Sequence, residues 1–185
     1  MDKKLANKRC ERVLWLDLEM TGLSPADDLI VEVAMIATDW DFKELANYHG
    51  IIKNDDISLQ KRFKANAEFW DENQQSRDAL ISQNSQGKPI VKIEREILDF
   101  IKKNFQSDSP VLLAGNSIHI DRQFIRANWP KFDAKLHYRM LDVSAWKVVF
   151  EGKFGKKYMK PDAHRALDDI RGSIDELKYY LDKLK

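Results

Sequence analysis

The spacing of apolar residues changes its period along the chain, and each period predicts a different kind of element. Residues 13–19 alternate as in a strand: Leu14, Leu16 and Leu18 share one face, and Val13, Trp15, Asp17 and Glu19 share the other. Two further apolar runs, Leu29–Thr38 and Leu45–Ile52, predict two more strands, and the segment Thr21–Pro25 predicts a turn after the first.

Helical periodicity follows these strands. The segment Ser58–Gln83 predicts a helix in two pieces, and Pro89–Phe105 predicts one amphipathic helix with isoleucines at helical spacing. The remaining elements are expected to alternate: a strand at Val111–Ala114, a helix at Ile118–Trp129 ended by Pro130, a strand at Arg139–Val143, a helix at Ser144–Phe150, a loop at Gly152–Pro161 and a helix at Ala163–Leu184.

Strands that come first and then alternate with helices are typical of an α/β fold with a mixed β-sheet flanked by α-helices. The 185 residues suit one core, and the chain contains no repeat, low-complexity segment or linker. We therefore expect a single domain over residues 1–185.

Two acidic residues stand out because they interrupt an apolar strand. Asp17 and Glu19 lie two positions apart on the same face, and burying two carboxylates together is costly unless a cation compensates. Mg²⁺ and Mn²⁺ prefer such oxygen ligands. The pattern alone leaves two interpretations open: a metal site, or an exposed sheet end where the acids are solvated.

Other acidic residues occupy positions where ligand sites are common. Asp121 lies near the start of a helix that follows a buried strand, which is a frequent site position in α/β sheets but also one that a helix dipole favours. His164, Asp168 and Asp169 lie at the start of the last predicted helix. Taken singly, each also suits a capping or surface role.

Charge and cysteine content narrow the possible partners. Lys and Arg number 31 against 30 acidic residues, a net charge of +1. Proteins that grip long nucleic acids usually carry a basic excess, so a short substrate fits better. The single cysteine, Cys10, excludes an internal disulfide and a zinc site of several thiolates. With no secretory signal and no long apolar stretch, we expect a cytoplasmic protein without membrane contact.

Several motifs together resemble a known family. The segments are Asp17-Leu-Glu19-Met-Thr-Gly-Leu23, Gly115-Asn-Ser-Ile-His-Ile-Asp121, His137-Tyr-Arg-Met-Leu-Asp-Val-Ser144 and His164-Arg-Ala-Leu-Asp-Asp-Ile-Arg171. The first two and the last resemble the motifs of the DEDDh superfamily of 3′→5′ exonucleases, and all four together resemble the oligoribonuclease family. The resemblance extends from Val13 to Leu181, although residues 144–150 depart from the family pattern.

The resemblance implies a ribonuclease-H-like fold and a 3′→5′ exoribonuclease that degrades short RNA, especially dinucleotides, to 5′-mononucleotides. It implies two Mg²⁺ or Mn²⁺ ions held by Asp17, Glu19, Asp121 and Asp169, with His164 as general base. Regular helical spacing would instead pair His164 with Asp168, so the resemblance and the spacing disagree at this point. We follow the resemblance and expect Asp168 to be solvated or to support a ligand.

The resemblance also implies the residues that hold the substrate. Leu23 is expected to act as a wedge between the two terminal bases and Trp70 as a stacking surface. The residues expected around the 5′ phosphate are Ser117, His137, Tyr138, Arg139 and Ser144. Tyr138 is assigned to the catalytic set because the His-Tyr-Arg segment enters the partner's site in a homodimer. The alternatives are core packing for Leu23 and Trp70, packing at a sheet edge for Tyr138, and helix capping for Ser144.

Some features remain open in the sequence. Glu32 interrupts a buried strand, and we favour a hydrogen-bonded supporting role over metal ligation. The basic segment Lys153–Lys160 could contact phosphates, but a solvated loop is the simpler interpretation. The rival functions are an exonuclease that acts on DNA 3′ ends and a non-catalytic nucleic-acid-binding module.

Overall fold

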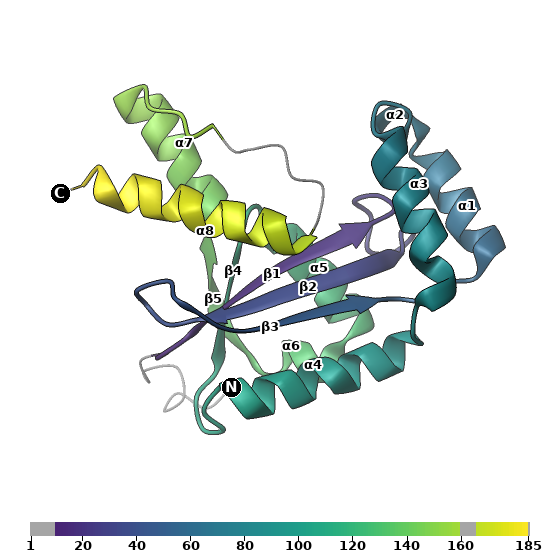
Figure 1. Cartoon of the computed structure of the whole chain (residues 1–185), viewed down its shortest axis with the longest axis horizontal. Coiled ribbons are helices and arrows are strands. Elements are labelled where there is room, and N and C mark those ends of the chain that lie inside the picture. The colour runs from purple at the N-terminus through teal and green to yellow at the C-terminus, as the bar shows by residue number, and fades with distance from the viewer. Residues whose placement is uncertain (1–9, 160–165, 185) are drawn as a thin grey trace.

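The computed structural model describes residues 10–159 and 166–184 and places a five-stranded sheet at the centre of the chain (Figure 1). The strands are β1 (Val13–Met20), β2 (Ile30–Thr38), β3 (Glu44–Ile51), β4 (Val111–Gly115) and β5 (Leu136–Asp142), in the spatial order β3-β2-β1-β4-β5. Pairing is antiparallel from β1 to β3 and parallel from β1 through β4 to β5. The sheet is therefore mixed, as expected.

Helices cover both faces of the sheet and one end (Figure 1). They are α1 (Asp56–Ala65), α2 (Ala67–Trp70), α3 (Gln74–Gln83), α4 (Ile90–Asn104), α5 (His119–Asn128), α6 (Pro130–Asp133), α7 (Val143–Phe154) and α8 (Ala166–Asp182), with a short 3-10 turn η2 (Asn84–Gln86) after α3. In the described ranges, no helix is long and apolar enough to cross a membrane.

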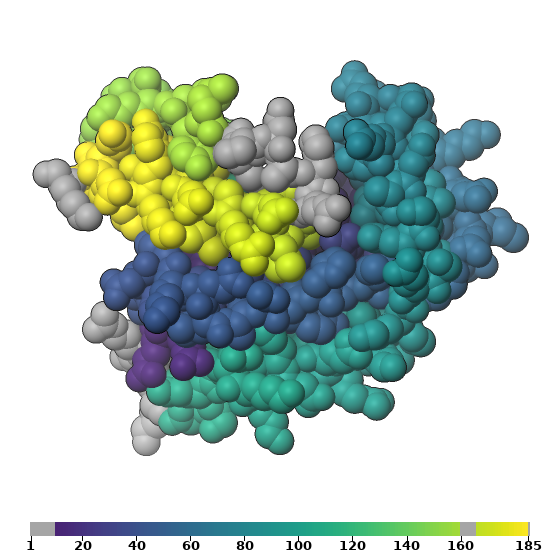
Figure 2. All heavy atoms as spheres, viewed as in Figure 1, coloured from purple at the N-terminus to yellow at the C-terminus, as the bar shows by residue number. Residues whose placement is uncertain are grey.

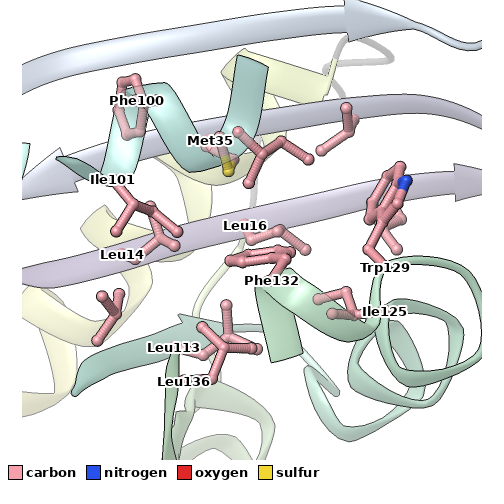
Figure 3. Close-up of a cluster of buried hydrophobic side chains, with 14 of the residues drawn as sticks. Leu14, Leu16, Met35, Phe100, Ile101, Leu113, Ile125, Trp129, Phe132 and Leu136 are labelled. Atoms are coloured by element: carbon pink, nitrogen blue, oxygen red, sulfur yellow. The ribbon is translucent and has the colours of Figure 1, made fainter. Parts of the chain in front are cut away.

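The face of β1 that carries the leucines forms the larger core. Leu14 and Leu16 pack there with residues of α4, α5 and α6, among them Ile101, Ile125 and Phe132 (Figure 3). These side chains are almost fully buried, and apolar burial on this scale is the main favourable term in folding. The alternation within β1 thus matches the expected division of its two faces.

The opposite face of β1 packs against α7 and α8. Val13 and Trp15 join Ile170 and Ile174 of α8 in a second cluster. Asp17 and Glu19 continue this face toward the end of the strand and are partly buried. The acids therefore lie at the end of a face that α8 packs against.

Parallel pairing of β1 with β4 sets the position of the site. Leu14 pairs with Leu113 and Trp15 with Ala114, so both strands end at the same edge of the sheet. Parallel strands place the segments that follow their carboxyl ends side by side, and ligand sites of α/β folds form there. The chain segments after Glu19 and Gly115 consequently converge.

Several boundaries differ from the expectation, and β5, for example, begins at Leu136 rather than at Arg139. Residues 58–83 form three helices rather than two, because the chain breaks at Asn66 and again before Gln74. The expected loop at 152–161 is wrong at its start: α7 continues through Gly152 to Phe154 and ends where Gly155 takes the left-handed conformation (φ 61°), a common helix stop. The final helix is described from Ala166 onward, and residues 163–165 lie outside the described residues.

Candidate active site

A buried carboxylate joins the first two motifs. Asp121, in the first turn of α5, is only 7% exposed, and its Oδ1 accepts a hydrogen bond of 2.9 Å from the backbone N–H of Leu18. Leu18 stands between Asp17 and Glu19 in β1. The contact therefore places Asp121 beside both acids, although more than a hundred residues separate them in sequence.

Burial makes this carboxylate unusual. Desolvation, with the negative charges of Glu19 and Asp142 adding to it, raises the pKa of Asp121 from its ordinary value of 3.8 to about 7. The backbone hydrogen bond from Leu18 opposes the shift but does not cancel it. A nearby cation would favour the ionised form that burial disfavours.

The last of the four motifs reaches the same region from α8. A groove of about 700 Å³ is lined by Glu19 of β1, by Asp168 and Asp169 of α8 and by residues of α2 and α3. In Figure 2, α8, in yellow, and the blue-green α1–α3 segment lie on opposite sides of the upper part of the molecule. The structure thus brings Glu19 and Asp169 to one groove. His164 lies outside the described residues.

The two adjacent acids of α8 differ in their surroundings. Asp168 is exposed and forms an ion pair with Arg171 at 3.1 Å, and Arg171 also bonds to Glu44 of β3. Asp169 is partly buried, and its backbone carbonyl accepts a hydrogen bond from Ser173. Asp168 is therefore held by a cation on the surface, whereas Asp169 is the more buried of the two acids.

The chemistry of these donors suits a hard divalent cation. Asp17, Glu19, Asp121 and Asp169 offer only carboxylate oxygens, the ligands that Mg²⁺ and Mn²⁺ prefer. A buried carboxylate with a raised pKa beside a second acid is a charge arrangement that a cation would stabilise. Within residues 10–159 and 166–184, no three such side chains are already gathered closely enough to hold an ion by themselves.

A second polar cluster forms where β4 and β5 end. The backbone N–H of Ser117 donates to Asp142 (3.0 Å) and to the Ser144 hydroxyl (2.9 Å), and the two serine hydroxyls are 3.1 Å apart. Asp142 also caps α7 by accepting from the Ser144 N–H. Ser117 adopts a left-handed backbone (φ 48°), which is uncommon outside glycine and often marks functional sites. The predicted partners Ser117 and Ser144 therefore do meet.

The other predicted phosphate-binding residues, His137, Tyr138 and Arg139, lie near the start of β5, away from its end at Asp142. Tyr138 is 48% exposed, and the Arg139 guanidinium lies 5.2 Å from the centre of its ring. His137 is buried, with Nδ1 accepting from the Arg139 N–H. Tyr138 precedes Asp142 by four strand positions, roughly 13 Å. It is therefore displaced from the serine cluster of its own chain.

A buried hub holds the turn that carries Leu23. The Asp28 carboxylate accepts hydrogen bonds from the Thr21 hydroxyl, the Ser24 N–H, the Arg62 guanidinium and the Asn66 amide. Burial raises the pKa of Asp28, but the hydrogen bonds from Ser24, Arg62 and Asn66 and the charge of Arg62 outweigh it, so the pKa is lowered from its ordinary value. Leu23 itself is 72% exposed. The structure thus holds an exposed apolar side chain on a firmly fixed turn, which excludes core packing as its role.

Trp70 is attached to the same turn. Its indole N–H donates to the Thr21 carbonyl (2.8 Å), and its ring packs edge-on against Phe63 and Phe69. Only 4% of Trp70 is exposed, although it lines the groove. Its role as a stacking surface stays a prediction.

Glu32 is hydrogen-bonded, as the sequence predicted. Its two oxygens bond to His49 Nε2 (2.8 Å) and Gln83 Nε2 (2.6 Å), and the bond to Glu32 raises the pKa of His49. Glu32 also lies opposite Glu19 in the antiparallel register of β1 and β2, and it lines the groove. This arrangement supports a role in shaping the groove next to Glu19.

Several groups at the site were not selected from the sequence. Asn116 donates to Ser173 (2.8 Å), and Ser173 bonds in turn to the Asp169 carbonyl, so one amide links the second motif to α8. Its place in the segment Gly115–Asp121 was a usable signal. Asp28 and Arg62 gave no such signal, because an acid after a Ser-Pro turn and a basic residue on a polar helix look solvated.

Comparison with known proteins gives consistent matches. Residues 14–177 match the family model RNase_T, described as exonuclease. The oligoribonuclease of Ralstonia nicotianae is 37% identical over 182 residues, covering 96% of this chain and 80% of that protein. The oligoribonuclease of Francisella tularensis subsp. tularensis is 39% identical over 179 residues, covering 94% and 96%.

Solved structures with the same fold are more distant. Exonuclease I from Methylocaldum szegediense superposes with a TM-score of 0.64 at 14% identity, over 94% of this chain and 41% of that one. A zinc-bound complex of E. coli exonuclease I with single-stranded DNA gives 0.60 at 13% identity, over 95% and 41%. The chain therefore spans less than half of these exonucleases, and the likeness shows the fold.

The raised pKa of Asp121 predicts a pH dependence of stability in the metal-free protein. Because the folded pKa lies above the unfolded one, the contribution of Asp121 is fully present below pH 3.8 and is lost as the pH rises through about 7. In chelator, we expect the free energy of unfolding of the wild type to fall over this range relative to Asp121→Asn, which cannot titrate. Urea unfolding at a series of pH values measures it, and parallel curves for the two proteins would contradict the assignment.

Proposed function

Since the chain belongs to the oligoribonuclease family of 3′→5′ exoribonucleases, we propose that it hydrolyses very short RNA, dinucleotides above all, to 5′-mononucleotides with the help of two divalent ions. Exonucleases of this superfamily depend on divalent metal ions. We propose that the ions are Mg²⁺ or Mn²⁺, that two of them act together, and that dinucleotides are the preferred substrates.

The observation that carries the proposal is the buried Asp121 carboxylate bonded to the backbone between Asp17 and Glu19. A buried carboxylate destabilises the fold unless a partner or a bound cation compensates its charge, and carboxylates with perturbed pKa values cluster at functional sites. Asp169 reaches the groove that Glu19 lines. These four acids would hold the ions, which supply a lowered pKa for the attacking water and stabilisation of the leaving 3′ oxygen.

The chain's own groups supply the remaining chemistry. His164, assigned from the family motif, accepts the proton of the attacking water, a task suited to a side chain that titrates near neutral pH. Leu23, held on the Asp28 hub, separates the two terminal bases. Ser117 and Ser144 hold the 5′ phosphate with hydroxyls that already lie together.

Short substrates follow from charge and shape. The net charge of +1 provides no obvious basic track for a long RNA. The groove is lined by four acidic residues, Glu19, Glu32, Asp168 and Asp169. In the absence of bound cations, these carboxylates repel a phosphate. Affinity then depends on recognising both ends of a small substrate.

The proposal includes a homodimer in which each chain completes the partner's site. Tyr138 and Arg139 are exposed on the edge strand β5, displaced from the serine cluster of their own chain. The neighbouring helix α7 exposes Val148 (71%) and Val149 (51%), and exposed apolar residues beside each other favour a protein partner. A second copy would cover this face and bring Tyr138 to the other 5′ phosphate.

A cytoplasmic location belongs to the same proposal. The chain has one cysteine, Cys10, so its fold needs no internal disulfide and suits a reducing compartment.

Product analysis tests the function directly. We expect purified protein to convert RNA dinucleotides to 5′-mononucleotides faster than longer RNAs and faster than deoxyribodinucleotides. Chelation should abolish the reaction because the proposed mechanism needs the cations that these acids would hold, and Mg²⁺ or Mn²⁺ should restore it. Full activity in excess chelator would contradict the metal mechanism, and faster cleavage of DNA would contradict the RNA assignment.

The adjacent acids of α8 form a matched pair for the metal assignment. We expect Asp169→Asn to lower kcat by more than the about 10–100-fold that loss of a supporting residue costs, because it removes a ligand. Asp168→Asn should stay within about tenfold, since its partner is Arg171. Steady-state kinetics, with thermal unfolding as a folding control, measure both. An inactive Asp168→Asn beside an active Asp169→Asn would reverse the assignment.

Complementation between variants tests the shared site. Tyr138→Ala and Asp17→Ala homodimers each lack one half of both sites, so we expect both to be nearly inactive on dinucleotides. Refolding them together should restore part of the activity, because one site of a mixed dimer has intact acids and an intact partner Tyr138. Dinucleotide hydrolysis by mixed dimers, verified by mass, is the measurement. No recovery would show that Tyr138 acts within its own chain or not at all.

A further inference from the structure

Phe69 is an aromatic residue exposed at the groove. It is 60% exposed on α2, although burying its ring would be favourable, and it lines the groove together with Glu19 and Asp169. Neighbouring Trp70 is almost fully buried. Of these two aromatic rings, Phe69 is therefore the one that offers an open surface to a ligand.

The surrounding structure fixes the position of this ring. Trp70 packs against Phe69 with ring centres 5.0 Å apart and planes at 83°. The backbone of Phe69 is held on both sides, because its N–H donates to Asn66 and its carbonyl accepts from the Asn73 amide (2.9 Å). Asn66 and Trp70 also bond to the Asp28 hub and to Thr21, so the Phe69 ring is fixed relative to the turn of Leu23.

The charges of the groove explain why an aromatic surface is useful there. Its acidic residues are Glu19, Glu32, Asp168 and Asp169. Its basic side chains are already paired, Arg171 with Asp168 and Glu44, and His49 with Glu32. Side chains in this groove therefore give a phosphate little direct attraction. Stacking on a base does not require charge, and every base offers a π-face.

We propose that Phe69 provides a further aromatic contact for a base in the groove, beside Trp70, which packs edge-on against it. This inference rests on the proposed function, because it assigns a nucleobase to the groove beside the metal acids. A phenyl ring offers no hydrogen bonds that distinguish one base from another, so Phe69 adds affinity for any base, and the gain is larger for the larger purines.

Substitution at this one position tests the proposal. Phe69→Ala should raise KM for an RNA dinucleotide by about tenfold, the size typical of one stacked base, with kcat nearly unchanged. Phe69→Tyr should retain the wild-type KM, because it keeps the ring. Phe69→Leu should resemble the alanine variant, because it keeps apolar volume but no π-face. The rise should be larger for purine than for pyrimidine dinucleotides.

The control is Ile57→Ala, which removes an 80% exposed apolar residue of α1 outside the groove and should change neither constant. Thermal unfolding checks that each variant keeps its fold; should Phe69→Ala be destabilised, the Tyr and Leu variants decide. Unchanged KM in Phe69→Ala, or full rescue by Phe69→Leu, would overturn the proposal. A wild type that hydrolyses no short RNA would contradict the proposed function instead.

Discussion

The site depends on one constraint: a carboxylate must be buried where two parallel strands end. Pairing of β1 with β4 brings the chain after Gly115 next to Leu18, and Asp121 then accepts the Leu18 N–H at 2.9 Å. The bond satisfies a backbone donor, yet it also leaves a charge-bearing group 7% exposed beside Glu19. The topology of the sheet therefore fixes the position of Asp121, and burial at that position raises its pKa.

Hydrogen bonds extend this arrangement to both sides of the groove. On one side, Asn116 and Ser173 connect the end of β4 to the helix that carries Asp169. On the other side, Trp70 and Asp28 connect the first turn to the α1–α2 segment. The acids that we assign to the metal site and the residues expected to hold bases are thus connected by hydrogen bonds, which limits how far they can move independently.

Much of the fold was predictable, because the alternation in β1 and the helical spacing of α4 are strong signals. The acidic pair was visible for the same reason: Asp17 and Glu19 break an otherwise apolar pattern. Residue spacing could not show that Phe69 is exposed, since apolar residues in a periodic segment are by default assigned to the core, and an accessible Leu23 was expected only from the family resemblance. It also misled at Gly152, where a glycine inside a helix resembles a helix end, and the stop comes at Gly155 instead.

The Asp28 hub has an evolutionary consequence. One carboxylate accepts from Thr21, Ser24, Arg62 and Asn66, so losing any partner leaves other groups without their bonds. A change at Asp28 would be tolerated mainly alongside a compensating change at Arg62, and neither step alone improves the protein. The effects of substitutions at these positions therefore depend on one another. We expect these residues to change slowly and in pairs during evolution, and the exposed residues around them to change independently.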